Sequence, residues 1–397
     1  MRSTNRGFKV MQNVAIVTIV AVVMGFAMVS CDTGDNDQFN IESFPGKIVI
    51  ITNKIDQDEE AFRSAQQVVT KYGSNEIAHI TWPTNFMAEQ NQMINNFAKI
   101  AANNNVKAII INQALPGTNA AVDKLLETRD DIFIVYCSPQ EHPLDVSDRA
   151  NLIMMPNEIA MGEPMVQQAK DMGAEVFVHY SFPRHMSQDM LSTRRDRISA
   201  ECTRLGITFV NIENAPDPAN NSTGGINATQ QFILKDVSDK IDEHGEDTAF
   251  FGTNCAMQIP LIKAVSDGGA IYPQPCCPSP FHGFPTALGI SAEVNNIKGT
   301  IEQTRNVLNG KNMLGRLSTW PVPASMLWTN AGVEYALRWI NDEVSKPGID
   351  DAVLAECMSD YIKDISGEDL GVNMTNCSDA FGTYDNYKLV LEDYLTY

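Results

Sequence analysis

The sequence predicts an α/β fold made of two doubly wound parallel-sheet lobes joined by a hinge. Three observations indicate this fold. Short apolar runs alternate with amphipathic stretches from residue 47 onward, which is the order of βαβ units in a parallel sheet. The alternation restarts near residues 151–157. The length of 397 residues also leaves room for two or three domains with cores of their own.

The first half contains four predicted strands. The first, Lys47–Thr52, has a continuously apolar centre, as strands covered by helices on both faces do. The others span Glu76–Ile80, Lys107–Ile111 and Asp131–Tyr136. The stretches between them have helical spacing. The acidic segment 56–60 suits the N-terminus of the first helix, whose apolar face continues as far as Gly73, where the helix is expected to end. Strands and helices that alternate over about 90 residues predict a parallel sheet with helices on both faces.

The second half repeats this arrangement. Its predicted strands are Ala174–Tyr180, Gly206–Ile212 and Asp247–Phe251. Amphipathic stretches before, between and after them predict four helices: Gly162–Met172, Ser187–Leu205, Thr229–His244 and Ala256–Val265. Ligands of open α/β sheets bind at the carboxyl ends of the strands. Two such halves therefore predict a cleft lined by loops of both lobes.

The N-terminus has the order of a secretory signal. Arg2, Arg6 and Lys9 precede an apolar run over residues 14–29, and Ser30 and Cys31 follow it. The ending Met28-Val-Ser-Cys31 resembles the bacterial lipobox, although Met stands where Leu is commoner. The resemblance implies cleavage before Cys31 and its lipidation, hence attachment to a membrane. A plain signal peptide or a membrane-spanning anchor is the alternative. Residues 32–44 begin with a polar, acidic stretch, which predicts that this segment is a flexible tether.

Charge and cysteine content restrict the function further. The net charge of −20 repels phosphate backbones, so we expect no nucleic-acid partner. Seven cysteines follow Cys31. Cys357 and Cys377 flank a polar stretch and could form a disulfide in an oxidising compartment. The pair Cys276-Cys277 with His282 suggests a metal site, but Cys-x-x-Cys pairs are absent. We therefore predict no metal and no cofactor.

Four local segments carry a family resemblance. They are Met155–Gly162, Ser192–Arg197, Phe250–Met257 and Gly315–Pro321. They resemble segments of type 1 periplasmic solute-binding proteins. The first two are similar to the segment that first crosses between the lobes and to an Ala-Arg-Glu-Arg motif that opens a helix. The last two are similar to an Ala-Gln-Asn-Asp motif at a strand end and to a late strand with the sequence Gly-Lys-Leu. That superfamily includes ribose-binding and purine-nucleoside-binding lipoproteins. Cys255 replaces the acidic residue of the third segment, which puts sugar-like hydroxyl recognition in doubt.

The resemblance implies a Venus-flytrap fold and a division of the chain. Lobe 1 is expected to comprise residues 45–155 plus about 323–397, and lobe 2 residues 156–322. It further implies that the chain belongs to a poorly characterised branch of the superfamily and binds a small solute between its lobes. The expected partners are the permease subunits of an ABC transporter. The tail after residue 345 exceeds the usual receptor tail. It could cap one lobe or contact a partner.

Polar residues after the strands of the first half are candidate ligand contacts. Asn53, Gln113 and Ser138 follow the first, third and fourth predicted strands. The resemblance implies that a polar group after the first strand faces the ligand. The alternative is local structure: an Asx turn or helix cap for Asn53, and loop hydrogen bonds for the other two.

The second half supplies four further candidates. Tyr180 and Arg184 end its first strand, and an arginine there could pair with a carboxylate or phosphate or could be solvated. The resemblance implies ligand contacts for Arg197, the second arginine of its motif, and for Asn254 at a strand end. A surface ion pair is the alternative for Arg197, since charged residues adjoin it.

Aromatic residues complete the candidate site. Trp320 precedes Pro321 near the second crossing, and Trp82 follows the second strand. Flat apolar walls with a few polar groups suit nucleosides, sugars or heteroaromatic rings. Aromatic residues with a purely structural role would look the same in the sequence.

Enzyme motifs are scarce, so we predict a binding protein. No Walker loop, no Gly-x-Ser-x-Gly elbow and no dinucleotide fingerprint occurs. The expected function is that of an extracytoplasmic, lipid-anchored receptor of an ABC-type importer, located at the cell membrane or in the periplasm. The alternatives are a sensor of the same fold that signals to a membrane partner and, less favoured, an extracytoplasmic hydrolase with His185 or His282 as base.

Overall fold

The computed structural model describes residues 40–397. The predicted signal peptide, Cys31 and most of the predicted tether lie outside the described residues. Within residues 40–397, no helix combines the length and the apolar composition that a membrane span requires.

The first sheet has seven strands in the order β10-β11-β5-β4-β3-β1-β2. They are β1 (Ile48–Thr52), β2 (Ile77–Thr81), β3 (Ala108–Asn112), β4 (Phe133–Cys137), β5 (Leu152–Pro156), β10 (Val372–Asp379) and β11 (Gly382–Glu392). All neighbouring pairs are parallel except β10 and β11. Every residue of β1, β3 and β4 is buried, which explains their unbroken apolar sequences.

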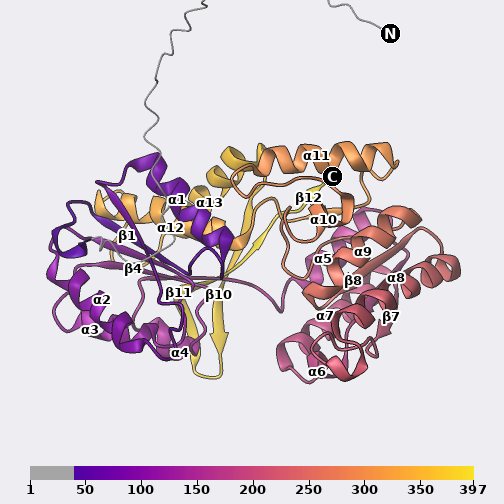
Figure 1. The fold of residues 1–397 in the computed structure, drawn as a ribbon, viewed down its shortest axis with the longest axis horizontal. Coiled ribbons are helices and arrows are strands. Elements are labelled where there is room, and N and C mark those ends of the chain that lie inside the picture. The colour runs from indigo at the N-terminus through magenta and orange to yellow at the C-terminus, as the bar shows by residue number, and fades with distance from the viewer. Residues whose placement is uncertain (1–39) are drawn as a thin grey trace, which may run out of the picture. The chain divides into compact units, whose positions relative to one another are not determined.

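Helices cover both faces of this sheet (Figure 1). Alternate strand residues pack into two separate cores, for example Ile48 and Ile50 on one side and Val49 and Ile51 on the other. One core adjoins α1 (Glu59–Tyr72), α12 (Ala324–Ile340) and α13 (Asp351–Ser366), and the other adjoins α2 (Gln90–Ala102) and α3 (Thr118–Leu126). The short elements η1 (Ile41–Ser43) and α4 (Pro143–Ser147) pack against α2 and β11, respectively.

The second sheet contains β6 (Val176–Tyr180), β7 (Thr208–Ile212) and β8 (Thr248–Gly252), in the order β7-β6-β8. Parallel bridges extend it, from Ala249 to Ile271 and from Tyr272 to Leu317. Its helices and short turns are α5 (Gly162–Asp171), α6 (Pro183–Met186), α7 (Asp189–Leu205), η2 (Asn221–Thr223), α8 (Gly225–His244), α9 (Cys255–Gly268), α10 (Phe284–Leu288) and α11 (Ile297–Gly310). Residues of α5 and α7 pack on one face, and residues of α8 and α9 on the other.

The two sheets have the same strand order. When the parallel strands of each half are numbered along the chain, both sheets begin 2-1-3-4-5, with Ile271–Tyr272 and Leu317 at the fourth and fifth places of the second sheet. This repetition confirms the predicted fold class of two doubly wound, mostly parallel α/β units. The predicted helices and strands all form, with ends that differ by a few residues.

The chain passes between the two sheets three times. Residues 157–161 lead from β5 to α5, residues 320–323 lead from β9 (Ser318–Thr319) to α12, and residues 393–394 lead from β11 to β12 (Leu395–Thr396). The strands β9 and β12 pair antiparallel with each other. The strands that border the second and third passages are therefore joined by backbone hydrogen bonds. The expected division of the chain into two lobes stays a prediction.

The tail after residue 345 forms regular structure. Its helix α13 covers the first sheet, and β10 and β11 add two strands to that sheet's edge. At its end, Tyr397 exchanges backbone hydrogen bonds with Gly315 and Leu317 of the second half, at 2.7 and 3.0 Å. The tail thus belongs to the body of the fold. Cys357 and Cys377 are free thiols in different cores, so they form no disulfide in this structure.

Candidate functional site

The strand order places a topological switch point in each sheet. Connections leave β1 and β3 in opposite directions, and likewise β6 and β8. In doubly wound folds, loops that diverge in this way flank the crevice at the carboxyl edge where ligands bind. We take the residues at these two edges as the candidate site.

Three predicted residues lie at the carboxyl edge of the first sheet. Asn53 is 8% exposed and directly follows β1. The side-chain oxygen of Gln113, after β3, accepts a hydrogen bond from Gln140 at 3.3 Å, and its carbonyl accepts one from the Trp82 indole at 2.9 Å. Ser138, after β4, has a left-handed φ of 45°, which a residue other than glycine seldom adopts. Adjacent parallel strands thus bring these three residues to one edge.

The first turn of α1 adds two carboxyl groups that sequence reasoning did not select. Asp58 caps the helix through a 3.0 Å hydrogen bond from the Ala61 amide. Glu60 accepts a 3.4 Å hydrogen bond from the Ser325 hydroxyl at the start of α12. Burial, and then the negative charge of Asp58, raise the pKa of Glu60 to about 7, although His282 opposes the change. Glu60 therefore lies where the first sheet's edge meets the second passage between sheets.

Two predicted residues of the second half have side chains engaged in pairs. Tyr180 is fully buried, and its hydroxyl donates a 2.8 Å hydrogen bond to Asp236 of α8. Arg184 forms two hydrogen bonds with Asp217, at 2.7 and 2.8 Å, and is about half exposed. The Tyr180 side chain thus points into the α8 face of its sheet.

Arg197 also has a partner. Its guanidinium lies 2.9 Å from Glu163, and both side chains are exposed. This ion pair links the surfaces of α7 and α5, and it is the kind of surface pair that was the alternative interpretation of Arg197. The structure therefore does not bring Arg197 together with the other predicted residues of the second half.

The buried arginine of α7 is Arg194, which the sequence reasoning missed. It is 2% exposed, pairs with Glu158 of the first passage at 2.8 Å and lies over the Phe251 ring. Its position would have been a signal, because it occupies the apolar stripe of α7 with Leu191 and Ile198. Arg194 links the second sheet to the segment that connects it with the first.

Asn254 lies at the start of α9, as predicted. Its side-chain oxygen accepts a 2.9 Å hydrogen bond from the Ala256 amide and so caps the helix. A Cβ on Gly252, the last residue of β8, would lie 2.8 Å from the Leu261 side chain. The absence of a side chain there lets α9 pack closely on β8, which holds Asn254 at the sheet's edge.

A buried polar cluster adjoins Asn254. The hydroxyls of Thr253 and Ser181 share a 2.9 Å hydrogen bond, and Thr253 also lies 3.1 Å from the His185 ring. Burial, followed by the charge of Arg184, lowers the pKa of His185. The cluster therefore presents neutral hydrogen-bonding groups after β6 and β8.

Three thiols and an imidazole gather on the other side of Asn254. Cys255 Sγ lies 3.7 Å from Cys276 Sγ, which lies 3.9 Å from Cys277 Sγ and 3.8 Å from His282 Nε2. The sequence drew attention to the last three residues but did not indicate that Cys255 joins them. The structure shows it exposed. Hydrogen bonds from the neighbouring thiols and from His282 lower the pKa of Cys255.

Trp320 lies in the second passage between the sheets and is 1% exposed. Nearby, the Tyr394 hydroxyl in the third passage donates a hydrogen bond to Gln274. The indole is thus buried between connecting segments. Trp82 is also buried and stacks on Phe97 with ring centroids 6.0 Å apart.

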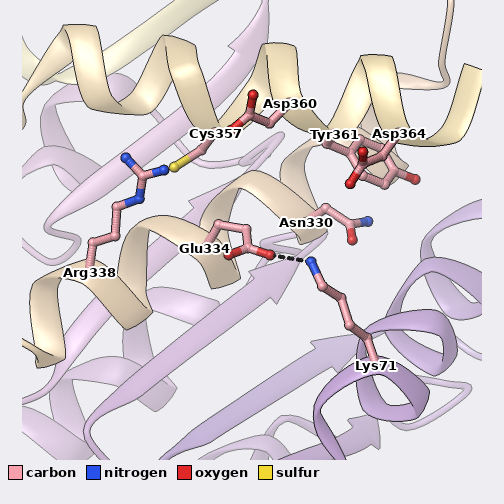
Figure 2. Close-up of a pocket in the computed structure, with 8 residues that line it drawn as sticks. All are labelled: Lys71, Asn330, Glu334, Arg338, Cys357, Asp360, Tyr361 and Asp364. Carbon is pink, nitrogen blue, oxygen red and sulfur yellow. Dashed lines mark hydrogen bonds and ion pairs between the residues drawn. The ribbon is translucent and has the colours of Figure 1, made fainter. Parts of the chain in front are cut away.

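A separate hollow lies away from the strand ends (Figure 2). It has a volume of about 190 Å³ and is lined by Lys71, Asn330, Glu334, Arg338, Cys357, Asp360, Tyr361 and Asp364. Lys71 belongs to the last turn of α1, at the opposite end from the β1 carboxyl edge, and pairs with Glu334 at 2.6 Å. Sites for drug-sized ligands usually exceed about 300 Å³. This hollow is therefore not our candidate site.

A family model described as "Protein of unknown function (DUF3798)" matches residues 46–318. The chain belongs to this family. Two uncharacterized proteins of Treponema pallidum (strain Nichols) are relatives. One is 33% identical over 172 residues, 43% of this chain and 78% of the relative. The other is 34% identical over 143 residues, 36% of this chain and 64% of the relative.

A solved structure shows the fold of this DUF3798 member. A protein from Clostridium difficile 630, described as a candidate transcriptional regulator, aligns with a TM-score of 0.80 at 19% identity, over 89% of this chain and 99% of that one. At this identity the likeness shows the fold alone. A sugar ABC transporter protein from Actinomyces odontolyticus aligns over 77% of this chain and 86% of its own, with 8% identity. Its TM-score is 0.47.

Proposed function

We propose that this DUF3798 protein is an extracytoplasmic solute-binding protein, anchored by lipid at Cys31, that delivers its solute to an ABC-type importer. The observation that supports this most is the repeated strand order. Two sheets with the same switch point are joined by three passages of chain. Each sheet then offers a ligand-binding edge, and short connecting segments suit a hinge.

The mechanism we propose is closure of two lobes on a small polar or heteroaromatic solute. Asn53, Gln113 and Ser138 would contact it from the first lobe, and Asn254 from the second. Solute that bridges both edges would favour the closed form by the difference between its affinities for the two forms. Permease subunits would recognise that form. We propose no catalytic step.

Thermal unfolding with a panel of nucleosides, sugars and heteroaromatic metabolites tests solute binding. A ligand at 100 times its Kd adds about 2.7 kcal/mol to the free energy of unfolding, so the true solute should raise the melting temperature clearly. Gln113→Ala and Asn254→Ala should reduce that rise. Lys235→Ala, at an exposed pair with Asp239, is the control and should keep it. No rise with any solute, together with no small molecule in the purified protein, would contradict the proposal.

The lipid anchor has its own test. Cells that express the full chain should incorporate radiolabelled palmitate into it, and the Cys31→Ser variant should not be labelled. A wild-type chain that stays unlabelled would rule out the anchor and leave the solute-binding proposal untouched.

A further inference from the structure

The thiol cluster lies at the carboxyl edge of the second sheet and is assembled from two separate segments. Cys255 is the first residue of α9, directly after β8. Cys276, Cys277 and His282 belong to the loop between the Tyr272 bridge and α10. The fourth strand position lies beside β8 in the sheet, so the loop that leaves it passes the start of α9. The fold itself therefore brings the four side chains together.

Two sulfur separations within the cluster match those of a tetrahedral metal site. A Zn–S bond of about 2.3 Å in a regular tetrahedron places neighbouring sulfur atoms about 3.8 Å apart. Two of the three sulfur separations are 3.7 and 3.9 Å. His282 Nε2 lies 3.8 Å from Cys276 Sγ, and the three sulfurs all lie within 4.8 Å of one another. The three sulfurs are thus already grouped, whereas the His282 ring lies outside the group that meets this limit and would have to shift to complete a tetrahedron.

The composition of the cluster also fits a thiophilic cation. Three cysteines and one histidine are one of the closed ligand sets of structural zinc sites. All three cysteines are free in this structure. Cys276 is 6% exposed, whereas Cys255 and Cys277 are exposed. Hydrophobic packing would account for the buried Cys276, but it does not account for two exposed cysteines whose sulfurs lie within 4.8 Å of it and of each other.

We propose that Cys255, Cys276, Cys277 and His282 bind one Zn²⁺ ion. The ion would fix the loop of residues 273–283 to the start of α9, beside Asn254. This site goes beyond the proposed solute binding and does not depend on it. An exported protein meets oxidants, and a disulfide between Cys255 and Cys276 is the competing fate of these thiols.

Cobalt substitution of the full, reduced, metal-free chain tests the site. One Co²⁺ per chain should produce the visible absorption of tetrahedral cobalt together with a thiolate-to-cobalt charge-transfer band, and one equivalent of Zn²⁺ should abolish both. Cys276→Ser should lower the charge-transfer intensity by about a third, because one of three thiolates is lost. His282→Ala should keep that band but shift the visible absorption. Cys377→Ser, a free cysteine outside the cluster, is the matched control and should leave the spectrum unchanged.

Two results would overturn the proposal. One is the absence of a thiolate charge-transfer band in the reduced wild-type chain. The other is protein isolated from cell envelopes with a Cys255–Cys276 disulfide and no bound zinc, as measured by peptide mapping and metal analysis. Circular dichroism of each variant shows whether it is folded. If Cys276→Ser is unfolded, Cys255→Ser and Cys277→Ser supply the same comparison.

Discussion

Replacement of Glu60 by glutamine should remove a pH dependence of stability. The pKa of Glu60 rises from 4.5 to about 7, first because of burial and then because of Asp58. Below pH 4.5 this carboxyl is protonated in both the folded and the unfolded chain. Between pH 4.5 and 7 the unfolded chain loses the proton while the folded chain keeps it, so rising pH favours unfolding.

The size of this effect follows from the same values. The difference between 4.5 and about 7, at about 1.4 kcal/mol for each pH unit, amounts to about 3 kcal/mol. The contribution is fully present below pH 4.5 and lost above pH 7. Glutamine carries no charge at any pH and can still accept the hydrogen bond from Ser325. The stability difference between Glu60→Gln and the wild type should therefore grow by about 3 kcal/mol from pH 4 to pH 8.

Urea unfolding of both proteins at pH 4, 6 and 8 measures this change. Because the comparison uses the difference between two proteins, the other titrating groups cancel. The matched control is Glu59→Gln, at a neighbouring residue that is 54% exposed, and it should show no such growth. Parallel pH profiles for the wild type and Glu60→Gln would refute the reasoning, because they would mean that Glu60 titrates alike in the folded and unfolded chain.

Three further changes have expected outcomes. Arg194→Met leaves Glu158, whose side chain is 27% exposed, without its partner and should lower the free energy of unfolding in urea by about 3 kcal/mol, the low end of the range for broken buried pairs. Adding Glu158→Gln to that variant should restore part of the loss. Asn254→Ala removes a helix cap and should cost about 1 kcal/mol of stability in the same assay, and a cost near zero would speak against the cap. Asp217→Asn breaks an exposed pair with Arg184 and should change the melting temperature little, since such pairs contribute about 0–1 kcal/mol.

The fold was predictable where burial dictates the sequence. The strand β3 is covered on both faces, and its residues Ala108–Asn112 are almost wholly apolar, so the sequence displays the strand. The strand β10, Val372–Asp379, lies at the edge of the sheet and is largely polar and exposed. An edge strand that is exposed does not need an apolar sequence. The sequence of the tail therefore did not reveal that the tail completes the first sheet.

The candidate site was less predictable, because its geometry depends on contacts between distant segments. The position of Asn254 was predictable, since a strand end before a helix is visible in a single segment. Cys255 was missed as a member of the thiol cluster, because its partners lie 21 residues or more along the chain. Arg194 was missed for another reason. Three arginines occur in one short charged segment, and only the packing of α7 shows which of them is buried.

The pairing of the arginines restricts the kind of solute we expect. Arg184 is bonded to Asp217 through two nitrogens, and Arg197 pairs with Glu163. An anionic solute that used either residue would first have to displace a carboxylate, and the gain from the new pair would be largely offset by the loss of the old one. The other predicted contacts at the strand ends, such as Asn53 and Gln113, are neutral amides or hydroxyls. Hydrogen bonds from such groups discriminate among hydroxyl, amide and ring-nitrogen patterns, so a neutral polar or heteroaromatic solute fits the site better than an anion.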